Sequence, residues 1–246
     1  MISYQIKQLE QVIKSKPISS AVTEVILHHT WSPNLAMWKE RGGSYQVSQA
    51  MVEGIKTYHM KEKGQSNIGY HWVITPDGLC WEGRPMVKQP SYSLGGHVLG
   101  RNDDSLGVAI VLNGDKESPT VLQAQAIGTL LGTLLKKLDI LPEKNFSARS
   151  GFHRDYATKT CPGSRISKGM VIGWVKDEAA RQSYEAEGDV EPDVSPWAES
   201  AVEWAVEKKL LTGFPDGMIH GRENLTREQM AVILLRFYDL IEAERG

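Results

Sequence analysis

The amino-acid sequence predicts an α/β protein with a mixed central β-sheet flanked by helices, followed by a small all-α C-terminal module. Short segments rich in β-branched residues alternate with longer helical patterns as far as Lys176. A stretch rich in Glu, Asp, Gly and Pro follows, and two further helical patterns come after it. We therefore expect a main domain over residues 1–178, a linker over residues 179–194 and a helical module over residues 195–246.

The first elements follow from apolar spacing. Apolar residues recur at helical intervals over residues 4–14, which predicts a short amphipathic helix that stops before a proline. The β-branched run over residues 22–28 predicts a buried strand. Residues 31–45 contain a proline and a glycine pair, so we expect a long loop there. The next helix is expected over residues 46–63, and Gly64 ends it.

The middle of the chain predicts three more strands and the strongest helix. Residues 70–75 and 79–82 are joined by the turn sequence Pro-Asp-Gly and are expected to form two successive strands. Residues 106–112 predict another strand. Residues 120–138 place six large aliphatic side chains on one face, which predicts a long helix. A loop over residues 147–163 follows.

The C-terminal module predicts two helices. Ser195 followed by Pro196 is typical of an N-cap with proline at the first helical position. Thr226 and Gln229 have the spacing of a capping box ahead of the second helix. A module this short can bury only a small core, so we expect it to be marginally stable alone.

Composition excludes several classes of partner. The net charge is −2, which predicts no nucleic-acid partner, although residues 189–246 are net acidic and residues 1–188 net basic. No apolar run approaches membrane-spanning length, which predicts no membrane partner. Two cysteines are not a disulfide framework, and no secretory signal is visible. We expect synthesis in a reducing cytoplasm without a signal peptide.

One spacing points to a specific chemistry. His153 and Cys161 lie eight residues apart in one loop, with Lys159 two positions before the thiol, and the strand over residues 22–28 ends in the pair His28-His29. One His from a strand end with a His and a Cys from a loop would give three ligands suited to Zn²⁺. Three protein ligands leave a fourth tetrahedral position for water, which is the layout of a hydrolytic site. Only one of the paired histidines should be a ligand, because adjacent strand residues point to opposite faces.

Five motifs occur in one order along the chain: His28-His29-Thr30, Gly69-Tyr70-His71-Trp72, Gly95-Gly96-His97, Asn102-Asp-Asp-Ser105-Leu-Gly107, and His153 through Lys159-Thr-Cys161-Pro-Gly163. Over roughly Val22 to Val175, this set resembles the zinc-dependent N-acetylmuramoyl-L-alanine amidases, a superfamily that includes phage lysozyme-like amidases and peptidoglycan recognition proteins. The resemblance implies hydrolysis of the amide bond between N-acetylmuramic acid and L-alanine in peptidoglycan by zinc-activated water.

The resemblance also implies roles for matched residues. It makes His28, His153 and Cys161 the zinc ligands, Tyr70 and Lys159 catalytic, and His97 a substrate-binding residue. Some amidases of this superfamily have a Glu general base at the position of Ala109, so here Tyr70 and Lys159 have to perform the proton work with the metal-activated water.

Plainer interpretations stay open for several residues. Cys161 could be a buried apolar thiol, Lys159 a solvated surface lysine, and His97 an ordinary loop histidine. Packing or hydrogen-bonding roles are expected for the remaining candidates: His29, His59, His71 and Cys80. A last group could line a sugar groove, although core packing is expected for any one of them: Trp31, Trp38 and Trp81.

The module over residues 195–246 resembles an S-layer homology repeat, which implies attachment to a secondary cell-wall polymer. Such repeats usually occur in threes and the sequence shows one. Three chains could each supply a copy as an oligomer, the single copy could bind weakly, or it could be a helical cap without a ligand.

The leading hypothesis is a phage-type endolysin that acts on the bacterial cell wall after release from the host cytoplasm. A cytoplasmic amidase that recycles muropeptides is an alternative enzyme. A peptidoglycan-binding protein without catalysis is the alternative from another class, and a Cys at the third ligand position argues against it.

Overall fold

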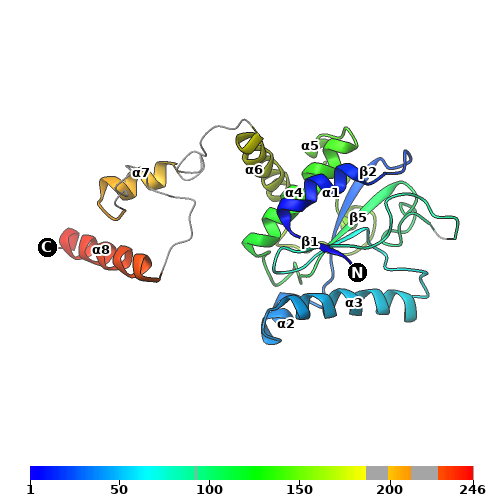
Figure 1. Ribbon diagram of the computed structural model, residues 1–246, viewed down its shortest axis with the longest axis horizontal. Coiled ribbons are helices and arrows are strands. Elements are labelled where there is room, and N and C mark those ends of the chain that lie inside the picture. The colour runs from blue at the N-terminus through cyan, green and yellow to red at the C-terminus, as the bar shows by residue number, and fades with distance from the viewer. Residues whose placement is uncertain (92, 187–198, 212–226, 246) are drawn as a thin grey trace. The chain divides into compact units, whose positions relative to one another are not determined.

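The computed structural model describes residues 1–91, 93–186, 199–211 and 227–245. The chain divides into two compact units, Met1–Ser183 and Tyr184–Gly246 (Figure 1). The first unit holds the sheet and the candidate site, and the second is helical where it is described. Among the described residues, none of the helices is long and apolar enough to cross a membrane.

The described part of the first unit contains a five-stranded mixed sheet in the order β1-β4-β3-β5-β2. Strand β5 pairs in parallel with both β2 and β3, whereas β4 pairs antiparallel with β3 and β1. The mixed sheet confirms the predicted fold class. The strand bounds are Ser3–Tyr4 for β1, Glu24–His29 for β2, Trp72–Ile74 for β3, Cys80–Glu82 for β4 and Ser105–Ile110 for β5.

Helices cover both faces of this sheet. Helices α1 and α4 lie on one face and α3 lies on the other (Figure 1). The helix bounds are Ile6–Ser15 for α1, Leu35–Glu40 for α2, Tyr45–Lys61 for α3, Val121–Lys137 for α4, Pro142–Asn145 for α5 and Lys168–Ala186 for α6, with a 3₁₀ turn, η1, at His153–Asp155.

The alternation of side chains along β2 decides which histidine faces which layer. Val25 and Leu27 belong to the apolar cluster formed with α1 and α4. His28 therefore points to the opposite face, the one that α3 covers. Ala109 lies beside His28 in the parallel register and belongs to the α3 cluster, which agrees with this assignment. The site is thus built on the α3 face, at the C-terminal end of β2.

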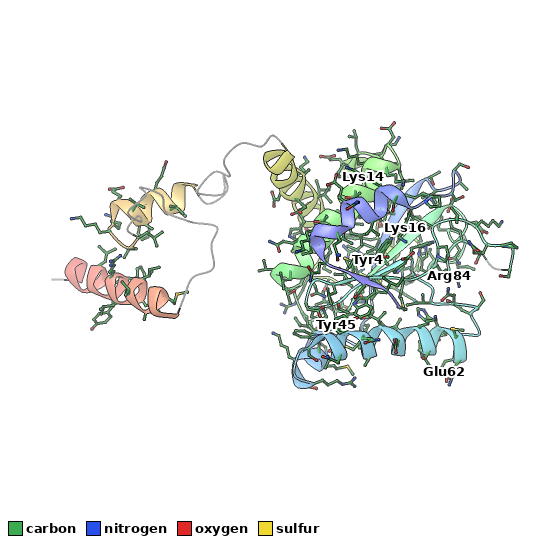
Figure 2. The ribbon with its side chains drawn as sticks, viewed as in Figure 1. Tyr4, Lys14, Lys16, Tyr45, Glu62 and Arg84 are labelled. Atoms are coloured by element: carbon green, nitrogen blue, oxygen red, sulfur yellow. The ribbon has the colours of Figure 1, made fainter. Side chains whose placement is uncertain are left out.

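The short edge strand β1 is held by charged and polar contacts. Tyr4 donates a hydrogen bond of 3.2 Å to Glu82, and the Lys16 Nζ forms a 2.9 Å ion pair with the same carboxylate. Tyr4 and Lys16 are labelled in Figure 2. These two contacts join β1 and the end of α1 to β4. The sequence did not predict β1, because two residues are too short for a periodic signal.

The predicted loop over residues 31–45 was wrong in part, because it contains α2. Asn34 caps this helix by accepting a hydrogen bond from the Met37 amide. The Glu117 carboxylate also accepts hydrogen bonds from the Leu35 and Ala36 amides, where the helix dipole favours a negative charge. This second cap comes from a distant part of the chain, so local patterning does not reveal it.

The boundary of the first unit also differs from the expected one. Residues 179–186, which we predicted as the start of the linker, continue helix α6. Residues 187–194 of the predicted linker lie outside the described residues, as do the predicted caps at Ser195 and Thr226. The proposed domain limits otherwise stay a prediction.

The described part of the second unit consists of α7 (Glu199–Glu207) and α8 (Arg227–Arg245). Leu210, just after α7, is buried, and Arg236 of α8 donates a hydrogen bond of 3.2 Å to its carbonyl oxygen. The module is therefore helical, as predicted, and this contact joins its two described helices.

Candidate metal centre

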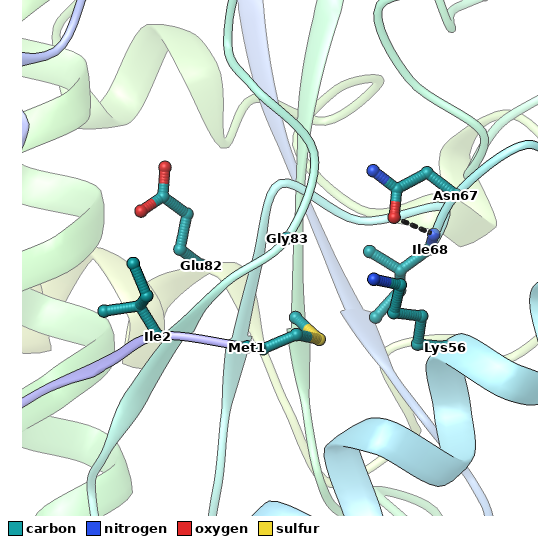
Figure 3. A pocket seen from close by; sticks show the side chains of 7 residues that line it. All are labelled: Met1, Ile2, Lys56, Asn67, Ile68, Glu82 and Gly83. Carbon is teal, nitrogen blue, oxygen red and sulfur yellow. Dashed lines mark hydrogen bonds between the residues drawn. The ribbon is translucent and has the colours of Figure 1, made fainter.

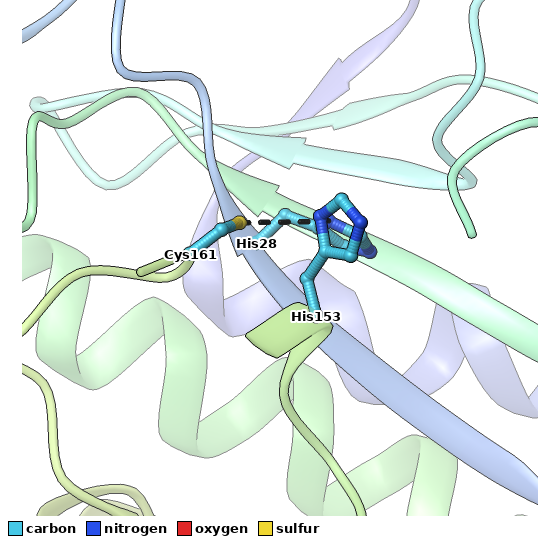
Figure 4. A group of neighbouring side chains, drawn as sticks. All are labelled: His28, His153 and Cys161. Atoms are coloured by element: carbon cyan, nitrogen blue, oxygen red, sulfur yellow. Dashed lines mark hydrogen bonds between the residues drawn. The ribbon is translucent and has the colours of Figure 1, made fainter. Parts of the chain in front are cut away.

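Three side chains from distant parts of the chain converge at the end of β2 (Figure 4). His28 and Cys161 are buried, and His153 is half-buried. The Nδ1 atoms of His28 and His153 are 3.2 Å apart, and Cys161 Sγ lies 3.7 Å from His28 Nδ1. The structure thus brings the three predicted ligands together, and metal binding by them stays a prediction.

Backbone contacts with β2 hold the loop that supplies two of these residues. The Leu27 amide donates to the Gly151 carbonyl, just before His153. The His29 amide donates a hydrogen bond of 3.3 Å to Cys161 Sγ. Strand β2 therefore supplies one donor directly and anchors the loop that supplies the other two.

Asp115 fixes the same loop from the side, and sequence reasoning missed it. Its carboxylate accepts a hydrogen bond of 2.7 Å from the Thr160 hydroxyl and one of 2.8 Å from the Ser164 amide. These hydrogen bonds lower the pKa of Asp115. Its partners lie about fifty positions further along the chain, and no local motif marks such a contact.

The donor set fits Zn²⁺ in both chemistry and spacing. Imidazole nitrogen and thiolate sulfur are common zinc ligands. For a tetrahedral ion with ordinary bond lengths, two nitrogens lie about 3.3 Å apart and a nitrogen and a sulfur about 3.6 Å apart. The observed separations of 3.2 Å and 3.7 Å match these two values.

Burial sets the protonation of the three donors. Burial, with neighbouring His97 and His153, holds the pKa of His28 well below its usual value. Burial and then the charge of Lys159 lower the pKa of His153 to about 4. Burial raises the pKa of the Cys161 thiol to about 12. At neutral pH both imidazoles are therefore unprotonated at one nitrogen, and the thiol has to lose a proton when a metal binds.

Tyr70 lies beside the cluster. Its ring centroid is 5.2 Å from that of His28, and its side chain is half-buried. Burial, and next the negative charge of Cys161, raises the pKa of the phenol, so the hydroxyl keeps its proton at neutral pH. His59, on α3, accepts a hydrogen bond of 2.9 Å from the Gly69 amide and packs against the Tyr70 ring, which fits its expected structural role.

Lys159 is exposed, and it lies on the loop between the predicted ligands His153 and Cys161. Its charge contributes to the lowered pKa values of His28 and His153, which places the ammonium group within electrostatic reach of the cluster. This location is compatible with stabilising negative charge on a substrate, and also with a surface lysine. The catalytic roles of Tyr70 and Lys159 stay predictions.

His97 is buried and contacts the cluster from inside the protein. Its Nδ1 lies 3.1 Å from His28 Nε2, on the opposite side of the His28 ring from the other two donors. Sequence reasoning expected this residue to bind substrate. Substrate binding by His97 stays a prediction, and the described contact is with the predicted ligand His28.

The histidines and the cysteine for which packing or hydrogen-bonding roles were expected lie outside the cluster. His29 is not part of the cluster, because its Nδ1 accepts a hydrogen bond of 3.0 Å from the Gly114 amide, which confirms its hydrogen-bonding role. His71 and Cys80 are fully buried, as expected of core residues.

The three candidate tryptophans also differ in burial. Trp81 is fully buried, and Trp38 is partly buried and donates to the Ser48 hydroxyl, which confirms packing roles for both. Trp31 is 61% exposed and adopts φ 61°, an uncommon backbone conformation for a bulky residue.

A separate cavity of about 280 Å³ lies near the N-terminus (Figure 3). None of the predicted site residues lines it. Its lining residues are Met1, Ile2, Lys56, Asn67, Ile68, Glu82 and Gly83.

The fold and the cluster first define a class of protein. An α/β domain with three convergent N and S donors has a donor set that suits a hydrolytic metal centre. Residues 18–164 match the family model described as N-acetylmuramoyl-L-alanine amidase. This match spans more than half of the chain, and the protein belongs to the N-acetylmuramoyl-L-alanine amidase family.

The second unit has a match of its own. Residues 189–231 match the model for the S-layer homology domain. Much of this stretch lies outside the described residues, so the match rests on sequence. The predicted combination of an amidase domain with an S-layer homology module is confirmed.

Individual relatives agree with the family. The endolysin of Enterobacteria phage T3 is 31% identical over 132 residues, which cover 52% of this chain and 76% of the phage protein. Peptidoglycan-recognition protein SC2 of Drosophila simulans is 26% identical over 157 residues, which cover 61% and 72% of the two chains. A solved structure of bumblebee PGRP-SA has a TM-score of 0.50 at 24% identity, covers 63% of this chain and 85% of its own, and supports the fold alone.

Proposed function

We propose that this protein is an endolysin-type amidase that hydrolyses the amide bond between N-acetylmuramic acid and L-alanine in peptidoglycan. The observation that supports this most strongly is the convergence of His28, His153 and Cys161 at zinc-like spacing, with Tyr70 beside them. Membership of the amidase family and the similarity to phage endolysins support the choice of bond and the wall as the place of action.

In the proposed mechanism, His28, His153 and Cys161 would hold Zn²⁺, which would supply an activated water and polarise the substrate carbonyl. The Tyr70 hydroxyl keeps its proton because its pKa is raised, so it donates a hydrogen bond to the oxygen on which negative charge develops. The Lys159 ammonium adds a positive charge on the solvent side of the site. Hydrolysis adds the hydroxyl of one water to the carbonyl carbon and the remaining proton of that water to the amino nitrogen of L-alanine, a transfer that Tyr70 and Lys159 would assist.

The strand next to His28 offers no general base. Ala109 lies directly beside His28 in the β5 register, where a Glu would reach the site, and its side chain carries no proton acceptor. Tyr70 and Lys159 are therefore the side chains assigned to hydrogen bonding and proton transfer in this mechanism.

We propose that the S-layer homology module holds the enzyme on the wall by binding a secondary cell-wall polymer, either as one copy or as an oligomer of chains. The whole chain should sediment with intact walls and less with walls from which this polymer has been removed by acid. Equal sedimentation with both would contradict polymer binding. The mass of the chain in solution, measured by light scattering, decides between one copy and an oligomer.

The products of wall digestion test the reaction. Digestion should release new L-alanine amino groups without new reducing sugar ends, and a zinc chelator should abolish it. New reducing ends would contradict the amidase proposal. Hydrolysis of soluble muropeptides but not of intact walls would favour a recycling enzyme, and wall binding without hydrolysis would favour a non-catalytic binder.

A further inference from the structure

The buried imidazole of His97 uses both of its ring nitrogens for contacts with the protein. Its Nδ1 lies 3.1 Å from Nε2 of His28, and its Nε2 lies 3.4 Å from the carbonyl oxygen of Ser105. The residue is 9% exposed. A ring with both nitrogens occupied by protein groups has little capacity left for a substrate.

The carbonyl partner decides where the protons are. A carbonyl oxygen can only accept, so the hydrogen of the neutral His97 ring is on Nε2. Its Nδ1 is then an acceptor, and His28 must donate to it through Nε2–H. His28 therefore has its lone pair on Nδ1, the atom that faces His153 Nδ1 at 3.2 Å and Cys161 Sγ at 3.7 Å.

Two glycines form a close-fitting site for the His97 ring. A Cβ on Gly107 would lie 2.6 Å from ring carbons of His97, and a Cβ on Gly95 would lie 2.7 Å from its Cδ2. Real Cβ atoms essentially never approach other atoms this closely, so any side chain at position 95 or 107 would clash with the His97 ring. The ring thus packs directly against the backbone at both glycines, and a larger residue at 95 or 107 would displace it.

The backbone of His97 is fixed as well. The Asn102 side-chain oxygen accepts hydrogen bonds of 2.7 Å from the His97 amide and 3.0 Å from the Val98 amide. Together with the glycines, this contact explains why Gly95-Gly96-His97 and the Asn102 to Gly107 motif occur together. The proposed reaction chemistry leaves both motifs without a role.

We propose that His97 is a positioning residue, which fixes the orientation and tautomer of His28 so that Nδ1 is presented to the metal. This inference rests on the proposed zinc site. Removing the group that hydrogen-bonds to the second nitrogen of a metal-bound histidine typically lowers metal affinity by about 10–100-fold. The alternative role, contact with substrate, would change the KM and leave zinc affinity unaltered.

Zinc affinity of the whole chain, measured by competition with a chromophoric chelator, tests the proposal without any peptidoglycan. His97→Leu keeps an apolar side chain of similar size but has no acceptor, and should bind zinc about 10–100-fold more weakly. His97→Asn can place an amide oxygen near the position of Nδ1 and should recover most of that loss. His59→Leu is the matched control, because it removes a histidine acceptor that contacts no predicted ligand, and its zinc affinity should equal that of the unmodified chain.

A spectroscopic readout tests the tautomer itself. In the zinc-free chain, nitrogen-15 NMR should find the His28 hydrogen on Nε2, and this preference should weaken in His97→Leu. Gly107→Ala should reproduce the affinity loss of His97→Leu, because its Cβ displaces the imidazole from His28.

Three results would overturn the positioning role. These are unchanged zinc affinity in His97→Leu, an equal loss in His97→Leu and His97→Asn, or a His28 hydrogen on Nδ1. Failure of the proposed function is distinguishable, because an unmodified chain that binds zinc but releases no L-alanine amino groups would contradict only the amidase reaction.

Discussion

Replacement of Tyr70 by Phe isolates the phenolic hydroxyl from the packing of its ring. The ring contacts with His28 and His59 stay, and within the described residues the hydroxyl has no protein hydrogen-bond partner. Removing it therefore leaves no buried group unpaired, and the free energy of unfolding should change by less than about 1 kcal/mol. Zinc content should stay the same, because Tyr70 is not a predicted ligand.

The catalytic effect of Tyr70→Phe should be large by comparison. Loss of one donor to a developing oxyanion reduces kcat by about 10²–10³-fold, equivalent to about 2.7–4 kcal/mol. The loss should be similar at pH 6 and pH 9, because the raised pKa keeps the phenol protonated throughout. Release of L-alanine amino groups from purified walls measures this rate. A kcat within threefold of the unmodified enzyme, or a loss confined to one end of the pH range, would refute the assigned role.

Three further outcomes follow from the same site and its support. Lys159→Met should reduce kcat by about 10²-fold with zinc content unchanged, and an unaltered rate would favour an ordinary surface lysine. Zinc binding at pH 6 should release about one proton, because the pKa of Cys161 is raised to about 12 and that of His153 is lowered to about 4. Calorimetry in buffers of different ionisation enthalpy measures the number of protons released, and release of two or more would contradict the expectation. Asn145→Ala should lower the free energy of unfolding, measured by urea denaturation, by about 2–4 kcal/mol, because the backbone N–H and C=O of Val25 both lose a buried hydrogen-bond partner. A loss below about 0.5 kcal/mol would contradict this expectation.

Local sequence patterns were sufficient to predict the structure where a single periodicity determines which way side chains point. Alternation along β2 places His28 on one face and His29 on the other, and the structure separates them in this way. The mixed sheet and the helices α3 and α4 also followed from apolar spacing, whereas helix α6 over Lys168–Ala186 was not predicted. The spacing of His153 and Cys161 in one loop anticipated their convergence with His28.

Contacts between distant residues were beyond such patterns. Helix α2 depends in part on Glu117, and the loop around Cys161 depends on Asp115. The burial of His97 against His28 follows from the tertiary packing of two glycine-containing segments, which no single motif describes. In each case the partner lies far away in the chain, so its effect appears only once the fold is known.

The metal content of the purified chain tests whether His28, His153 and Cys161 form a zinc site. We expect close to one zinc per chain after exchange into metal-free buffer, and a large loss in Cys161→Ser, since a hydroxyl is a much poorer zinc ligand than a thiolate. An unmodified chain without near-stoichiometric zinc, or a Cys161→Ser variant that retains it fully, would contradict the His28, His153 and Cys161 site.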